Sequence, residues 1–117
     1  MQPLTPLSFH ILLALADEQR HGYAILKEVA RQSGGGLQPG TGALYTSIQR
    51  LMDEDLIAVA TRRPAADDDP RRRYYRLTAE GTAALAAETG RLRNLLHVAK
   101  QKKVVPRLAP AAARERS

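Results

Sequence analysis

The sequence contains no cysteine, and it has no long apolar run. Without cysteine the chain has no disulfides, no thiolate metal ligands and no thiol nucleophile. The apolar stretch Ile11–Ala16 falls well short of the roughly 18 residues that a membrane-spanning helix needs. It also lacks the basic flank and cleavage site of a signal peptide. We therefore predict a cytoplasmic protein with no membrane partner.

Catalytic and metal-binding constellations are missing as well. The serines have no paired base, and the carboxylates cluster on predicted surfaces. His10 has no second histidine or carboxylate at metal-ligand spacing, and His21 has no nucleophile that it could serve as a base. We predict structural roles for both histidines, with a capping or interhelical hydrogen bond for His21. We expect no enzyme activity, no cofactor and no metal.

Positive charge is the property that the chain has in excess, and it is unevenly placed. The 117 residues suffice for one domain, and their net charge is +6. Residues 1–60 carry four basic and six acidic side chains, a charge of −2, whereas residues 61–117 carry fourteen and six, a charge of +8. Such charge attracts polyanions without selecting a sequence, so DNA, RNA and an acidic membrane surface all stay open on this observation.

The stretch Gly40–Leu56 predicts an amphipathic helix that is opened by a Gly/Thr turn. One stripe of it is apolar, the opposite face is small or hydrogen-bonding, and acidic residues are confined to the last turn. Recognition helices present such an N-terminal half to base edges in the major groove, although an ordinary surface helix also has an apolar stripe. The stripe holds Leu44, Ile48, Leu51 and Met52, and the opposite face holds Gly42, Ala43, Thr46, Gln49 and Arg50.

The surrounding elements place this helix in a larger pattern. Two helices are predicted before it, at Leu4–Asp17 and Tyr23–Gln32, and two strands after it, at Ile57–Thr61 and Arg72–Leu77. The first helix is apolar on more than one side, which predicts burial on more than one side. A helix followed by a basic two-stranded hairpin is the order of a winged helix-turn-helix. The predicted fold class is therefore mainly α with a small β-hairpin wing, over residues 1–78.

The loop between the two strands carries both signs of charge. Asp67–Asp69 can pair with neighbouring arginines, and like charge repels them from phosphate, so we expect a solvated tip that stays out of a groove. The strand-borne Arg72 and Arg73 are the predicted phosphate contacts. The arginines near the acidic run are Arg62, Arg63 and Arg71.

The last predicted helix, residues 79–103, is unusually long, and Thr78 is its predicted N-cap. Apolar side chains recur along it at heptad spacing, far from the winged domain, so we expect a partner helix there. An antiparallel return onto the chain's own domain is the alternative. Residues 104–117 are predicted to form a disordered basic tail. The predicted dimer contacts on this helix are Leu85, Leu92, Leu96 and Ala99.

Four motifs over about Leu4 to Lys100 resemble those of the PadR family of transcriptional regulators, in the family's order. Residues 21–25 resemble its HGY turn into the second helix, residues 42–45 its GTLY, residues 50–51 its RL pair, and residues 72–81 its RRYYRLTxxG. Two positions depart from the pattern. Ala43 replaces the usual Thr, which removes one contact to DNA. Asp55 replaces the Gly that usually ends the recognition helix, and Asp tolerates the left-handed conformation that this position would need.

The resemblance implies a homodimeric regulator, commonly a repressor, that binds an inverted-repeat operator in double-stranded DNA. It also implies that the first helix contacts the partner subunit, which adds Leu7 and Ile11 to the predicted dimer interface. Many relatives bind small aromatic effectors, but with no Trp and one Phe an aromatic-walled pocket is hard to build here. The contrasting hypothesis is a winged helix that docks its basic surface on an acidic protein. The predicted DNA contacts are Thr41, Gly42, Tyr45, Thr46, Gln49, Arg50, Arg72 and Arg73.

Overall fold

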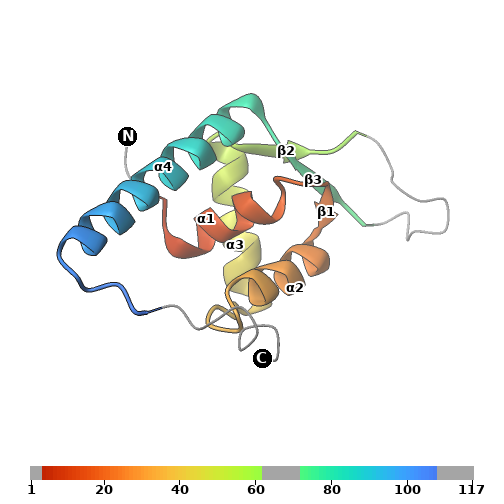
Figure 1. Ribbon diagram of the computed structural model, residues 1–117. Helices are drawn as coiled ribbons and strands as arrows, with labels where there is room; N and C mark the ends of the chain where they lie inside the picture. The colour runs from red at the N-terminus through yellow and green to blue at the C-terminus, as the bar shows by residue number, and fades with distance from the viewer. Residues whose placement is uncertain (1–3, 62–71, 108–117) are drawn as a thin grey trace.

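Residues 4–61 and 72–107, which the structure describes, form four helices and a three-stranded antiparallel sheet in this computed structural model (Figure 1). The predicted fold class, mainly helical with a small β wing, is confirmed. The predicted wing tip at Asp67–Asp69 and the tail beyond residue 107 lie outside the described residues. In chain order the elements are α1 (Pro6–Ala14), β1 (Arg20–His21), α2 (Gly22–Gln32), α3 (Thr41–Asp53), β2 (Ile57–Val59), β3 (Tyr74–Leu77) and α4 (Ala79–Gln101).

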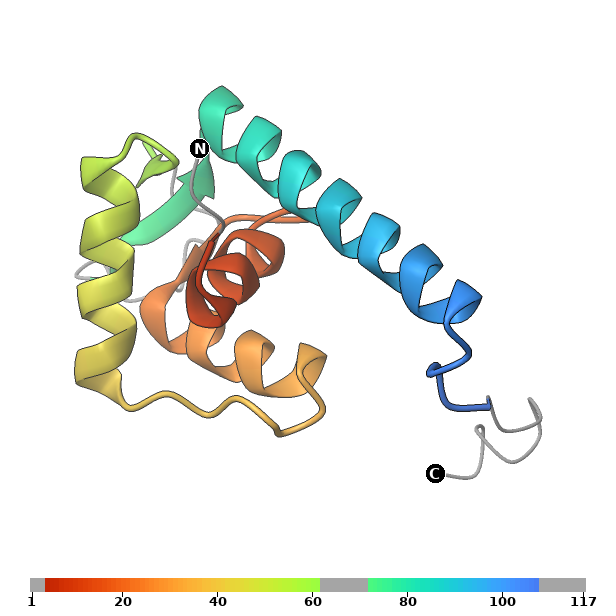
Figure 2. The same cartoon turned by 90° about the vertical axis from the view of Figure 1, so that its left-hand side faces the viewer.

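The first three helices share one apolar core, and α1 lies at its centre (Figure 2). Ile11 and Leu12, on adjoining sides of α1, have no exposed surface, which explains why that helix is apolar nearly all round. The predicted stripe of α3 is confirmed at three positions that are each 1% exposed, and Met52 is half-buried beside them. Each such side chain contributes about 1.5–3 kcal/mol on burial. The three buried positions are Leu44, Ile48 and Leu51.

Side chains satisfy the free N–H groups at three of the four helix starts. An acceptor at the cap position binds the N–H three residues further on, which stabilises a helix by about 1 kcal/mol. The predicted caps at Thr78 and His21 are both confirmed. The caps are Thr5 Oγ1 to Ser8 N (3.1 Å), His21 Nδ1 to Ala24 N (3.2 Å) and Thr78 Oγ1 to Gly81 N (2.9 Å).

The end of α3 is joined directly to the start of α4. Asp55 ends α3 in the left-handed conformation that was predicted for it, with φ of 61°. The Thr78 hydroxyl donates to the Asp55 carbonyl at 2.6 Å while it caps α4. Gly81 lies against the backbone of Leu56, so closely that a Cβ on Gly81 would be 2.9 Å from the Leu56 carbonyl carbon. This close contact fixes the origin of α4 on the turn that follows α3.

The sheet has the order β1-β3-β2, so the second wing strand is its centre. In β2, Ile57 lies opposite Leu77, and in β1, His21 lies opposite Tyr74. The strand β1 was not predicted, because the residues before α2 resemble a short polar connection and two residues show no periodicity. Its consequence is that the residue capping α2 is also hydrogen-bonded into the wing.

Several predicted boundaries were too generous. Helix α1 ends at Ala14, three residues before the predicted end, and α4 ends at Gln101, two residues before it. The predicted strands lose residues at their outer ends, since β2 stops at Val59 and β3 begins only at Tyr74. At the end of α4, Lys103 takes a left-handed φ of 61°, which terminates the helix.

Helix α4 lies in two environments along its length, and Figure 2 shows it running from the wing side past α1 and then away from the other helices. Its first half packs on the domain, where Leu85 and the carboxylate of Glu88 are each 8% exposed. Arg91 donates to Glu88 at 3.0 Å, and this hydrogen bond holds the pKa of the carboxyl below its usual value. In the second half of α4, Leu92, Leu95 and Leu96 are 39–48% exposed.

None of the described helices has the length and apolar character needed to cross a membrane.

Candidate nucleic-acid interface

One face of α3 is open to solvent along its length, on the side away from α1 and α2 (Figure 2). All six predicted contact residues of this helix are exposed, whereas the apolar stripe beneath them is buried. Gly40 precedes the helix and provides no side-chain cap to its first turn. The middle of the face holds a shallow depression of about 530 Å³ lined by Tyr45, Thr46, Gln49, Arg50 and Asp53. The predicted contact residues of the helix are Thr41, Gly42, Tyr45, Thr46, Gln49 and Arg50.

An intrahelical hydrogen bond occupies part of this face. The Gln49 amide donates to the Asp53 carboxylate at 2.9 Å. Pairs of this kind stabilise a helix by only about 0.2–0.5 kcal/mol, so a base edge of matching hydrogen-bonding pattern can displace Asp53 from the amide.

The aromatic ring of Tyr45 is packed at the junction with α2. Its side chain is 45% exposed, and its hydroxyl end lies against Gly22, the first residue of α2. A Cβ on Gly22 would be only 2.6 Å from Cζ of the tyrosine ring. Gly22 therefore permits a close approach of α2 and α3, and the side chain that requires it is Tyr45. Gly22 thereby fixes the position of a predicted DNA contact.

The wing brings its own predicted contacts to the same junction, because β3 is paired with β1. Arg72 and Arg73 immediately precede β3, and both are exposed. Within β3, Tyr75 is 4% exposed, and this burial raises the pKa of its phenol, opposed by the nearby charge of Arg73. Tyr75 is therefore a packing residue of the wing.

His21 occupies the centre of this junction. Its Nε2 lies 3.3 Å from Nη1 of Arg72, and its ring packs edge-to-face on Tyr74 with centroids 5.2 Å apart. A cap or an interhelical hydrogen bond is predicted for this histidine from the sequence, and its contact with the wing is not. The missed signal is the pairing of β1 with β3, which sequence periodicity does not reveal.

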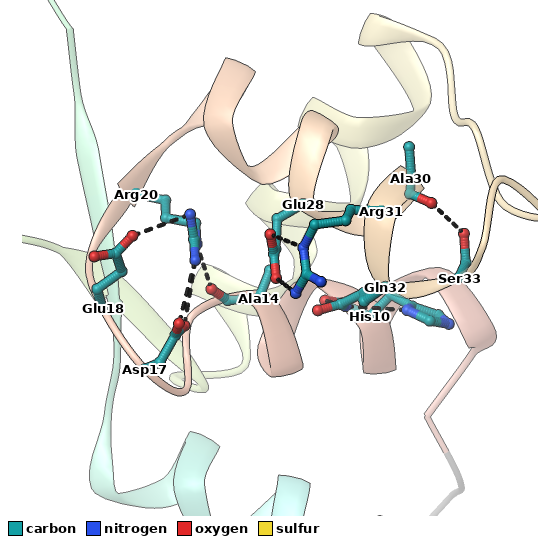
Figure 3. Close-up of polar contacts among 10 residues, drawn as sticks. All are labelled: His10, Ala14, Asp17, Glu18, Arg20, Glu28, Ala30, Arg31, Gln32 and Ser33. Atoms are coloured by element: carbon teal, nitrogen blue, oxygen red, sulfur yellow. Dashed lines mark hydrogen bonds and ion pairs between the residues drawn. The ribbon is translucent and has the colours of Figure 1, made fainter. Parts of the chain in front are cut away.

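Polar contacts on the opposite side of α2 hold it against α1 (Figure 3). The Gln32 amide donates to the His10 carbonyl at 2.7 Å and lies 3.0 Å from Nδ1 of the same histidine. Arg20 donates to the Ala14 carbonyl at 2.8 Å, which ties the start of β1 to the end of α1. The structural role predicted for His10 is therefore confirmed. Within residues 4–61 and 72–107, no group of His, Asp or Glu side chains could hold a metal ion.

The predicted dimer contacts fall into two groups. Ile11 has no exposed surface and Leu85 is 8% exposed, because both belong to the core of the chain itself. Neither can offer more than a trace of area to a second subunit, so the burial of both side chains argues against their predicted place in the interface. Leu7 and Ala99 are half-buried, and Leu92 and Leu96 are 39% and 48% exposed.

Comparisons with known proteins agree with this arrangement. The family described as "Transcriptional regulator PadR-like family" matches residues 11–87, which include α2, α3, the wing and the start of α4. The chain belongs to the PadR-like family. It is thus a transcriptional regulator with a winged helix-turn-helix, in a family of DNA-binding proteins that are not enzymes.

Individual PadR-like relatives are distant in sequence. An uncharacterized protein X of Lysinibacillus sphaericus is 30% identical over 76 residues, which cover 65% of this chain and 68% of that protein. A PadR family transcription regulator from Clostridium difficile R20291 is 23% identical with a TM-score of 0.68, over 83% of this chain and 97% of the other. A PadR-like transcriptional regulator from Bacillus cereus is 20% identical with a TM-score of 0.69, over 86% of this chain and 93% of the other. The two solved structures support the fold alone.

Two glycines with crowded surroundings should respond differently to substitution. In Gly22→Ala the new methyl meets the end of the Tyr45 side chain, which can swing aside. We expect this variant to fold and to show displaced Tyr45 ring resonances by NMR. In Gly81→Ala the methyl meets backbone, and the free energy of unfolding should fall by about 1–3 kcal/mol in a urea titration. Gly90→Ala, with nothing within 4 Å of the added methyl, is the control and should gain about 0.5–1 kcal/mol. Equal losses at positions 22 and 81 would contradict this account.

Proposed function

We propose that this PadR-like regulator binds double-stranded DNA as a homodimer, with α3 in the major groove and the wing on the adjacent backbone. The observation that carries the proposal is the junction at Gly22. There the open face of α3, the start of α2 and the arginines before β3 are joined by the Tyr45 contact and the β1–β3 pairing. Two adjoining surfaces, which carry hydrogen-bond donors and positive charge, are thereby held at fixed positions relative to each other.

The residues divide into those that position the protein and those that select a sequence. Arg72, Arg73 and Tyr45 would contact phosphates, which sets the register on the duplex without reading bases. Gln49 and Arg50 are long enough to reach base edges, where Gln suits adenine and Arg suits guanine. Thr41, Thr46 and the backbone at Gly42 would complete the groove contacts. Few side chains read bases, so a useful operator needs two copies of α3, and the symmetry of the dimer makes that operator an inverted repeat. We propose repression because it is the common mode of the PadR family.

The second half of α4 supports the homodimer. Leu92, Leu95 and Leu96 form a stripe that is 39–48% exposed and runs beyond the part of the helix packed on α1. A heptad-spaced apolar stripe of this kind is stabilised by a second helix. Leu7 and Ala99 are half-buried and can add to the contact. We propose that the α4 helices of two subunits pack on each other through these residues.

The wing arginines should contribute to the salt dependence of DNA binding. Replacing both Arg72 and Arg73 by Ala should weaken binding to all duplexes alike, because phosphate contacts carry no sequence information. The slope of log affinity against log salt should become shallower by about 0.9 for each lost contact. A variant with Arg93→Ala and Lys100→Ala removes the same charge from exposed positions of α4, and it should keep the wild-type slope. An unchanged slope in the wing variant would exclude these arginines from the interface.

A charge in the apolar stripe of α4 should separate the subunits. We expect Leu92→Asp to sediment as a folded monomer, since an unpaired charge buried in a helix interface costs about 3–5 kcal/mol. Ala83→Asp is the control. Ala83 is exposed on the side of α4 opposite to Leu92, so this variant should stay dimeric. The homodimer is refuted if the wild-type protein itself sediments as a monomer at tens of micromolar, a rough working concentration.

A further inference from the structure

The imidazole of His21 makes a different contact at each of its two nitrogens. On one side Nδ1 is the N-cap of α2 and lies 3.2 Å from the Ala24 backbone nitrogen. On the other side Nε2 lies 3.3 Å from Nη1 of Arg72, in the wing. The edge-to-face contact with Tyr74, at an interplanar angle of 84°, fixes the plane of the ring between them. The histidine is half-buried, and the pairing of His21 with Tyr74 in the sheet restrains its backbone.

The cap decides which nitrogen carries the proton. A backbone N–H can only donate, so Nδ1 of His21 must accept from Ala24 and must be unprotonated. In a neutral imidazole the proton is then on Nε2, which makes that nitrogen a donor. A guanidinium also has donors and no acceptor. The neutral ring and Arg72 therefore present two donors to each other at 3.3 Å, and this pair is not itself a hydrogen bond.

Two donors that converge in this way are suited to share one anionic acceptor. We propose that His21 is a DNA-binding residue, which donates Nε2–H to the same backbone phosphate that Arg72 binds. The inference rests on the proposed DNA-binding function and adds to it a ligand from the junction of α2 and the wing. The first turn of α2 contains no acidic side chain, so nothing in it repels a phosphate. His21 and Arg72 have other partners in the chain as well, with which the phosphate competes.

The cap explains only one of these contacts. Capping of α2 accounts for the position of Nδ1, and Asn, Ser or Asp would cap at least as well. The cap alone does not account for a ring that reaches from the helix start to the guanidinium of a predicted phosphate contact. The two roles can therefore be separated by a side chain that caps the helix but does not reach Arg72.

His21→Asn is that substitution, because its amide oxygen can accept from Ala24 while the side chain is shorter than imidazole. The variant should melt close to the wild type and bind every duplex about tenfold more weakly at pH 8, where an ordinary imidazole is neutral. The slope of log affinity against log salt should stay unchanged, since a neutral donor releases no counterion. Arg72→Ala, in contrast, should reduce that slope by about 0.9.

The shared phosphate can be located by replacing each phosphate of a bound duplex in turn with a neutral methylphosphonate. At one position per half-site, the replacement should weaken the wild type strongly and weaken both His21→Asn and Arg72→Ala much less. If every position weakens wild type and His21→Asn equally, the proposal is overturned, although DNA binding itself stands. If the wild type binds no DNA, both proposals fail together.

Nitrogen NMR of the wild-type protein tests the same claim without a substitution. The free protein should show His21 with Nε2 protonated and Nδ1 bare, and added duplex should shift the Nε2–H signal and slow its exchange with water. A ring protonated on Nδ1, or an Nε2–H signal that DNA leaves unchanged, would contradict the proposal.

Discussion

The orientation of α3 depends on two close contacts, one near each end of the helix, and both require a glycine. Near its start Tyr45 lies against Gly22 of α2, and just beyond its end the backbone of Leu56 lies against Gly81 of α4. No side chain fits at either glycine without displacing the neighbour. The first contact fixes a predicted phosphate ligand relative to α2 and the wing, and the second fixes the origin of α4. The proposed DNA-binding face and the proposed dimer helix are therefore both positioned by α3.

This arrangement connects the dimer to the proposed operator. Because α4 starts from the turn after α3, the second half of α4 projects from the domain in a direction that the Gly81 contact determines. If two α4 helices pack through Leu92 and Leu96, the positions of the two α3 helices follow from that packing. Thr78 is hydrogen-bonded both to Asp55 and to the first turn of α4, so it links α3 rigidly to α4. The spacing of the half-sites would then depend on this link.

Much of this architecture could be predicted from local chemistry. The apolar period predicted α3, the residue type at Thr78 predicted the cap of α4, and a cap was one of two roles predicted for His21. The tolerance of Asp for left-handed backbone predicted the end of α3 at Asp55. These features depend on neighbours in sequence. The order of the helices and wing strands was predicted from their residue patterns and is confirmed by the structure. The resemblance to the PadR family is confirmed by the family match.

The parts that were missed depend on partners distant in sequence. Strand β1 exists only because β3 pairs with it. It has two residues, which are too few to show the alternation of apolar and polar side chains that predicts a strand. Ile11 was assigned to the interface because the PadR resemblance implies that the first helix contacts a partner subunit. A helix that is apolar on more than one side does not reveal which face meets its own core. Leu85 and Leu92 lie on one heptad stripe, yet the first is 8% and the second 39% exposed, because the stripe continues past the end of the domain.

The central claim, that paired copies of α3 read DNA, is tested most directly by selecting bound duplexes from a random pool with the wild-type protein. The account predicts an imperfect inverted repeat, with half-site centres about 10 base pairs apart or at a multiple of one helical turn, because both helices must meet the major groove on one face. A parallel selection with Gln49→Ala should lose preference at one position in each half-site. Enrichment of a single half-site, or of no common sequence, would contradict the account.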